Sequence, residues 1–206
     1  MRILLAADIF GVTGDLLEIA AAVGGNGNRS RIIGPYPASV RFNDEDLAYA
    51  AFIRHGGVDS YTKKVLGHLA DSGDKPLACI GFSAGAAALW RAMADPAAEG
   101  VSLAVCLYGS QIRNAVTVEP RCPCLLVFPE EEPHFSVAEL IGCLRHRPRI
   151  RCAAVPWRHG YMNRLSRNFN REGHARTLAW LRWLLDCPDR AGGDQDVFHS
   201  LIRAAT

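Results

Sequence analysis

The chain has 206 residues, about half of them apolar, and a formal net charge of +2. These values predict one globular domain with a sizeable core, and the near-neutral charge argues against a nucleic-acid-binding protein. No stretch approaches the roughly 20 apolar residues of a membrane span, and the opening MRILLAAD lacks the long apolar region of a signal peptide.

Seven cysteines is an odd number, and Cys79, Cys106 and Cys152 lie inside apolar runs. This pattern is typical of buried, reduced thiols rather than of a disulfide framework. The sequence has no CxxC or HExxH motif, and CPC at Cys122–Cys124 has the wrong spacing for a zinc site. We therefore expect a cytoplasmic protein without a metal or other cofactor, which associates with neither membranes nor nucleic acid.

Six short runs are predicted as strands. They are Arg2–Ala7, Arg31–Ile33, Leu77–Gly81, Ser102–Tyr108, Cys124–Phe128 and Ile150–Val155. These runs are largely apolar throughout, as in a parallel sheet covered by helices on both faces. The predicted helices are Gly14–Val23, Asp44–Arg54, Ser60–Asp71, Ala84–Ala94, Val137–His146 and Arg171–Leu185. The alternation predicts a doubly wound α/β fold with right-handed crossovers.

Boundary residues support several of these helices. Asn43 and Asp59 are predicted N-caps, and Gly24–Gly25 and Gly56–Gly57 are predicted helix ends. We divide the chain into one domain, residues 1–190, and a C-terminal tail, residues 191–206. The tail begins with a Gly-Gly break and ends in a short amphipathic stretch, which can dock on the body, contact a partner or be loosely ordered.

The stretch CIGFSAGAAALW places Ser83 between two glycines at a strand-to-helix turn. Small neighbours allow the tight turn of a nucleophile elbow, which lifts the serine hydroxyl above the sheet edge. The Ala84 amide then lies at a helix N-terminus, where it can face a developing oxyanion. The alternative is that Ser83 caps the helix and the glycines serve only packing.

A serine nucleophile needs a base, and the base needs an orienting acid. Downstream, LLVFPEEEPHFS runs from a strand into an acidic turn, and VPWRHGYMNRL runs from a strand into His159. The order of serine, acid and histidine, each after its own strand, is that of α/β-hydrolases. We therefore interpret Ser83 as the nucleophile and His159 as the base, with His134 of the acidic turn as the main alternative base.

At these residues the chain resembles the dienelactone hydrolase family of α/β-hydrolases. ADIFGV resembles the family's Glu-Ile-Phe-Gly stretch, GFSAGAAALW its elbow, LYG the next strand end, PEEEPHFS its acid loop and HGYMNRLSRNFN its histidine loop. The resemblance extends from about Met1 to Leu185 and implies an α/β-hydrolase fold. Because the chain starts just before the first of these strands, we expect a trimmed sheet of about six strands in the order 2-1-3-4-5-6.

By position, the resemblance implies Ser83 as nucleophile, Glu132 as acid and His159 as base, with the backbone amides of Ile9 and Ala84 as the oxyanion hole. Dienelactone hydrolases proper have cysteine and aspartate at the nucleophile and acid positions. Glu130 and Glu131 remain alternatives for the acid.

The resemblance also indicates candidate substrate-binding residues. Asp8 takes the place of a glutamate that contacts the nucleophile in dienelactone hydrolases. The arginine that binds the substrate carboxylate in those enzymes is replaced by Asn163, followed by Arg164. Tyr36, with Phe42 and Tyr49, belongs to a segment that is predicted to wall the pocket, although aromatic residues at helical spacing also suit a core.

Together these features predict a serine hydrolase that cleaves a small ester or lactone through an acyl-enzyme. Thioester cleavage and acyl transfer would use the same residues, and the sequence does not separate them. The alternative is a non-catalytic relative that binds a small molecule or a protein partner. A homodimer is compatible with a chain of this size, but no residue indicates one.

Overall fold

The computed structural model describes residues 1–25, 27–37, 39–71, 77–186 and 197–202. At its centre is a six-stranded, wholly parallel sheet with the strand order β2-β1-β3-β4-β5-β6. The strands are β1 (Arg2–Ala6), β2 (Arg29–Ile33), β3 (Leu77–Phe82), β4 (Val101–Leu107), β5 (Cys124–Pro129) and β6 (Ile150–Val155). The predicted fold class and strand order are confirmed.

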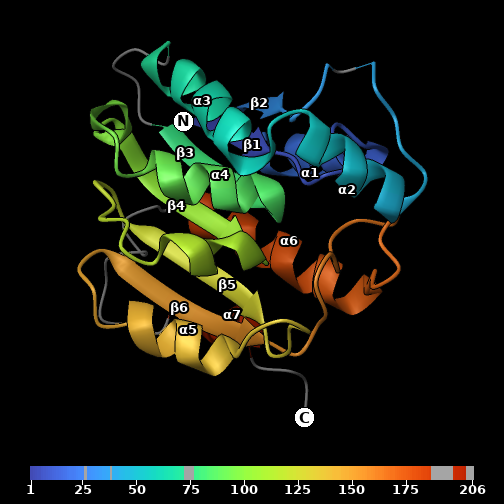
Figure 1. The fold of residues 1–206 in the computed structure, drawn as a ribbon. Coiled ribbons are helices and arrows are strands. Elements are labelled where there is room, and N and C mark those ends of the chain that lie inside the picture. The colour runs from blue at the N-terminus through green and yellow to red at the C-terminus, as the bar shows by residue number, and fades with distance from the viewer. Residues whose placement is uncertain (26, 38, 72–76, 187–196, 203–206) are drawn as a thin grey trace.

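Helices cover both faces of the sheet (Figure 1). One face carries α2 (Glu45–Arg54), α3 (Gly57–Ala70), α4 (Ala84–Ala92) and α5 (Val137–Leu144). The other carries α1 (Gly14–Val23), α6 (Arg171–Asp186) and the short α7 (His199–Ile202). Two 3-10 turns, η1 (Pro96–Ala98) and η2 (Ser110–Ala115), flank β4.

Both N-cap predictions are wrong by a small shift. The side chain of Asp44, not Asn43, caps α2 by accepting a hydrogen bond of 2.8 Å from the Leu47 amide. Helix α3 begins at Gly57 rather than beyond Asp59, because Gly56 adopts a left-handed φ of 88° and turns the chain sharply after α2. The Gly56–Gly57 pair therefore ends one helix and starts the next.

The described part of the tail docks on the body of the protein. Val197, Phe198 and Leu201 are buried against α6, and the Trp180 indole N–H donates to the Val197 carbonyl at 2.8 Å. The rings of Trp180 and Phe198 stack with their centroids 5.8 Å apart. Of the three expected states of the tail, docking thus holds for residues 197–202. The boundary at residue 190, and residues 191–196 and 203–206, lie outside the described residues.

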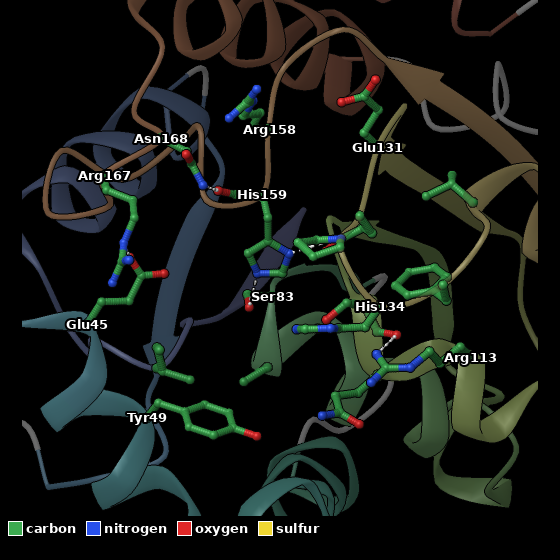
Figure 2. A pocket seen from close by; sticks show the side chains of 18 of the residues that line it. Glu45, Tyr49, Ser83, Arg113, Glu131, His134, Arg158, His159, Arg167 and Asn168 are labelled. Atoms are coloured by element: carbon green, nitrogen blue, oxygen red, sulfur yellow. Dashed lines mark hydrogen bonds and ion pairs between the residues drawn. The ribbon is translucent and has the colours of Figure 1, made fainter.

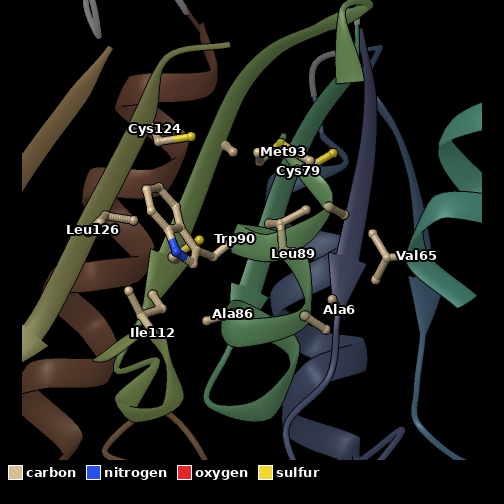
Figure 3. Packing of buried hydrophobic residues seen from close by; sticks show 14 of the residues in the cluster. Ala6, Val65, Cys79, Ala86, Leu89, Trp90, Met93, Ile112, Cys124 and Leu126 are labelled. Carbon is tan, nitrogen blue, oxygen red and sulfur yellow. The ribbon is translucent and has the colours of Figure 1, made fainter. Parts of the chain in front are cut away.

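Helix α4 is buried along almost its whole length because small residues let it lie close to the sheet. Figure 3 shows its Trp90 and Leu89 within the core, with Trp90 beside Leu126 of β5. The Trp90 indole N–H donates to the Ala115 carbonyl at 2.8 Å, which ties α4 to η2. The helix that starts at Ser83 is therefore fixed on several sides.

The six cysteines in the described residues are free thiols. Cys79 and Cys106 are buried, as predicted, whereas Cys152 is only partly buried. Burial raises the pKa of the Cys79 and Cys106 thiols, which keeps them protonated and unreactive. None of the described helices has the length and apolar character needed to cross a bilayer.

Candidate active site

Ser83 stands on a sharply strained turn between β3 and α4. Its φ of 50° and ψ of −112° are rare for a residue with a side chain. The two flanking glycines are sterically required, because a Cβ on Gly81 would lie 2.6 Å from the Ala86 Cα, and one on Gly85 only 2.2 Å from the Ala6 carbonyl oxygen. The Ser83 side chain does not cap α4. The helix-cap interpretation is therefore wrong, and the turn has the geometry of a nucleophile elbow.

His159 joins Ser83 to Glu132 in a continuous hydrogen-bonded chain. Figure 2 shows the His159 ring above Ser83. Its Nε2 lies 2.8 Å from Ser83 Oγ, and its Nδ1 lies 2.7 Å from Glu132 Oε1. The Glu132 side chain is only 7% exposed, whereas the imidazole is 26% exposed and open to the cleft. The structure thus brings together three residues from the ends of β3, β5 and β6.

The alternative acids and the alternative base lie in the same cleft but outside this chain. Glu130 and Glu131 are exposed in its lining, and Figure 2 shows the Glu131 carboxylate turned away from Ser83. His134 also lines the cleft, yet it is His159 that shares a hydrogen bond with Ser83.

Local structure holds Glu132 and His159 in place. Glu132 lies in a tight turn that is closed by an isolated bridge to Phe135. The ring of Tyr108 packs edge-on against the His159 ring at 5.3 Å, and Asn168 Nδ2 donates to the His159 carbonyl at 3.0 Å. The imidazole is therefore restrained both through its ring and through its backbone.

The two expected oxyanion donors, Ile9 and Ala84, both line the cleft beside Ser83. Ala84 is the first residue of α4, so its amide belongs to the electropositive end of that helix. Ile9 follows Asp8 at the end of β1, in a turn where the Gly11 amide donates to the Asp8 carbonyl at 3.1 Å.

Asp8 and Asn163 do not line the cleft, contrary to the expectation that they bind substrate. Asp8 is 8% and Asn163 5% exposed. The Asp8 carboxylate accepts from the Phe10 amide at 2.9 Å and from Asn163 Nδ2 at 2.8 Å. Burial raises the pKa of Asp8 to about 6, although both hydrogen bonds act to lower it.

Tyr36 and Arg164 are also outside the cleft. The Tyr36 hydroxyl donates to the Ala48 carbonyl at 2.8 Å and its ring packs on Phe42, so this tyrosine belongs to the core behind α2. Arg164 forms ion pairs with Asp15 and Glu18, which draw it onto α1. Tyr49 does line the cleft, from an exposed position on α2.

The cleft has a volume of about 1080 Å³, enough for a small-molecule ligand. Its lining comes from the loops after β1, β3, β4, β5 and β6 and from α2; the residues are Ile9, Glu45, Asp46, Tyr49, Phe52, Ser83, Ala84, Ser110, Gln111, Arg113, 130–138, Arg158, His159, Arg167 and Asn168. Within the described residues no cluster of three or more His, Cys, Asp or Glu side chains could hold a metal ion.

Sequence reasoning missed the wall formed by η2. Arg113 lies over the Phe135 ring at 5.0 Å and donates to the Ser110 carbonyl at 2.7 Å. It also missed Arg167, which pairs with Glu45 at 3.1 Å and so connects the histidine loop to α2 across the cleft. The available signal was position, because segments that follow the carboxyl ends of parallel strands meet at one edge of the sheet.

No protein-family model matches the chain. A curated relative, the uncharacterized protein YczH of Bacillus subtilis (strain 168), is 33% identical over 141 residues, which cover 68% of this chain and 68% of that protein.

Several solved structures share the fold at low sequence identity. A cold-adapted esterase from an Arctic intertidal metagenomic library is 18% identical with a TM-score of 0.60, over 88% of this chain and 82% of the esterase. A dienelactone hydrolase-like promiscuous phosphotriesterase from metagenomic libraries is 14% identical with a TM-score of 0.63, over 90% of this chain and 85% of the phosphotriesterase. A putative hydrolase of the α/β superfamily from Xanthomonas campestris pv. campestris is 13% identical with a TM-score of 0.60, over 90% of this chain and 98% of that hydrolase.

Proposed function

The chain belongs to the same family as YczH of Bacillus subtilis and has the α/β-hydrolase fold of dienelactone hydrolase-like proteins, and from this premise we propose that it is a serine hydrolase that cleaves a small ester or lactone. The observation that carries the proposal is the hydrogen-bonded chain from Glu132 through His159 to Ser83, with distances of 2.7 and 2.8 Å. Ester hydrolysis also agrees with the esterase among the solved structures of the same fold.

In the acylation step Ser83 Oγ attacks the carbonyl carbon of the ester while His159 Nε2 takes the hydroxyl proton. Glu132 accepts the Nδ1–H hydrogen bond, which selects the imidazole tautomer and stabilises the imidazolium that forms. The amides of Ile9 and Ala84 donate to the tetrahedral oxyanion, and one such donor typically contributes about 3 kcal/mol. His159 then gives its proton to the leaving alkoxide as the ester C–O bond breaks.

Deacylation repeats these steps with water. His159 takes a proton from a water molecule that attacks the acyl-enzyme, and it returns that proton to Ser83 Oγ as the acid product leaves. With a lactone the released hydroxyl stays attached to the acyl chain, so the two steps give a single hydroxy acid.

A fluorophosphonate reagent tests the nucleophile directly, because it forms a covalent adduct only with an activated serine. We expect one adduct, mapped to Ser83 by mass spectrometry, absent in Ser83→Ala and strongly slowed in His159→Ala. The matched control is His134→Ala, which removes the other histidine of the cleft and should react like the wild type. A protein that forms no adduct, at reagent levels that label ordinary esterases, would be a non-catalytic ligand-binding relative instead.

The acid is tested with three isosteric variants. Glu132→Gln should lower kcat by up to about 10⁴-fold, because it leaves the imidazole in the wrong tautomer. Glu130→Gln and Glu131→Gln leave the hydrogen bond between Glu132 and His159 intact, and both variants should retain near wild-type kcat. A large loss in either of these two would reassign the acid.

A further inference from the structure

Three loops must keep a fixed relative position for the proposed chemistry to work. They are the nucleophile elbow around Ser83, the oxyanion loop Asp8–Gly11 and the first part of the histidine loop, His159–Asn163. Two of them are locked together by backbone packing, since Gly85 of the elbow region lies so close to β1 that a Cβ there would meet the carbonyl oxygens of Ala6 and Ala7 at 2.2 and 2.4 Å. The histidine loop is tied to α1 through Arg164 and Asp15 and to α2 through Arg167 and Glu45. A further, buried connection leads to the oxyanion loop.

That connection is the buried pair of Asp8 and Asn163. One carboxylate oxygen of Asp8 accepts from the Phe10 amide, next to Ile9, at 2.9 Å. The other accepts from Asn163 Nδ2 at 2.8 Å. A single carboxylate thus connects the peptide that carries a proposed oxyanion donor to the loop that carries the proposed base.

Asn163 is itself held rigidly with respect to His159. Its amide donates to the Gly160 carbonyl at 3.0 Å, and its Oδ1 accepts from the Leu165 amide at 3.0 Å. Gly160 has a φ of 84°, and a Cβ there would meet Ser166 Oγ at 2.4 Å. The turn that follows His159 is therefore compact, and a displacement of Asn163 would be passed on to the imidazole.

We propose that Asp8 and Asn163 are a positioning pair, which fixes the oxyanion loop relative to the histidine loop and so sets the place of the Ile9 amide relative to Ser83 and His159. This inference rests on the proposed function. The pair touches neither the substrate nor the reacting atoms, since both side chains lie behind the cleft and outside its lining. For the pair to hold, one of the two buried side chains must accept the hydrogen bond that the other donates.

The substitution Asp8→Asn tests this requirement with almost no change in shape. The new side chain still accepts from the Phe10 amide, but its NH₂ group then faces the NH₂ group of Asn163. Since misplacement of a catalytic element by about 1 Å costs roughly 100-fold, we expect kcat for a small ester to fall about 10- to 100-fold with KM nearly unchanged.

The double swap of Asp8→Asn with Asn163→Asp is the rescue. In the swapped pair the amide at position 8 donates to the carboxylate at position 163, whose second oxygen still accepts from the Leu165 amide. We expect kcat to recover most of its loss. The stability control is Ile3→Val on the same strand, at the end far from the site, which should cost about 0.5–1.5 kcal/mol of stability without lowering kcat.

Hydrogen–deuterium exchange gives a readout that does not need activity. Asp8→Asn should speed the exchange of amides in Ile9–Gly11 and in Gly160–Asn163 together, and the swap should slow both again. The variants can show this exchange pattern while the wild type neither hydrolyses esters nor labels with the phosphonate. That result would reject the proposed function and leave the pairing of Asp8 with Asn163 standing.

Three results would overturn the positioning role. The first is an unchanged kcat in Asp8→Asn, and the second is a rise in KM alone, which would mean that Asp8 contacts the substrate. The third is a double swap that recovers neither kcat nor the slow exchange of the two loops.

Discussion

Gly85 follows the proposed nucleophile by two residues, and its lack of a side chain is required by the backbone of β1. A Cβ at this position would lie 2.2 Å from the Ala6 carbonyl oxygen, a contact that no rotamer change relieves. We expect Gly85→Ala to lower the free energy of unfolding by about 3 kcal/mol, as overpacking against a fixed backbone does. Urea denaturation of the variant measures this loss.

Gly142→Ala is the matched control for that substitution. Gly142 lies within α5, and an added Cβ meets no atom within 4 Å. The change should raise the free energy of unfolding by about 0.5–1 kcal/mol, because alanine favours the helix. Equal stability of the two variants would show that the close approach of Gly85 to β1 does not exist in solution.

Because Asp8 is buried, we also expect the free energy of unfolding of the protein to depend on pH. Its pKa is raised to about 6 by burial, so between about pH 4 and 6 the folded chain holds this proton and the unfolded chain does not. The folded state is therefore favoured at low pH, and that contribution is lost as the pH rises through 6. At about 1.4 kcal/mol for each pH unit, the loss amounts to about 3 kcal/mol.

The comparison of wild type with Asp8→Asn isolates this effect. The titratable groups around the carboxylate are present in both proteins: His159, Glu45, Tyr36, Tyr61 and Tyr108. Burial raises the pKa of the three tyrosines, so they stay neutral in this range. Between pH 4 and 7 the stability of the variant should rise by about 3 kcal/mol relative to wild type. Parallel pH profiles of the two proteins would rule out a raised pKa for Asp8.

Ser83, Glu132 and His159 line one cleft, because strand ends converge at one edge of the sheet. Sequence reasoning identified Ser83 and His159 because each follows its own strand, and the family resemblance selected Glu132 from the acidic turn. It failed for Arg164, whose side chain turns outward to the acidic residues of α1. The position of a loop residue along the chain does not fix the direction of its side chain. Partners that are distant in sequence, here Asp15, decide that direction.

Among the elements, hydrophobic runs and helical periodicity located the strands and longer helices, and the bounds of α1 were predicted without error. The short helix α7 carries too little periodic sequence to be defined by itself. Its place depends on tertiary contacts, above all on Trp180 of α6, which stacks on Phe198 and donates to the Val197 carbonyl. Sequence patterns report local preference and do not reveal such a docking site.

Docking of α7 predicts that Phe198 contributes strongly to stability although it lies near the end of the chain. Its side chain is 4% exposed, and we expect Phe198→Ala to cost about 3–5 kcal/mol in the free energy of unfolding. Ile202→Ala, at the end of α7, removes a side chain that is 40% exposed and should cost far less. Similar, small losses in both variants would mean that α7 does not dock in solution.

At the scale of the whole molecule, one sheet supports two hydrophobic cores. Along β1, Leu4 and Ala6 point into the core under α4, and Ile3 and Leu5 point into the core under α6. This alternation follows from the period of two in a strand, and it continues through β3 and β5 and, from Leu103 onward, through β4. Neither core can persist once the sheet separates.

We therefore expect the two cores to unfold in one cooperative transition, which a single variant can report from both faces. In Trp90→Phe the buried tryptophan fluorescence comes from Trp180 and Trp157, both in the core under α6. Buried thiols such as Cys79 and Cys124 lie in the other core, under α4.

Pulsed thiol labelling and fluorescence in urea should give the same midpoint, after the labelling of the exposed Cys143 has been subtracted. Thiols that react at clearly lower urea than the fluorescence change would show that the α4 core, and with it the nucleophile elbow, opens independently of the rest.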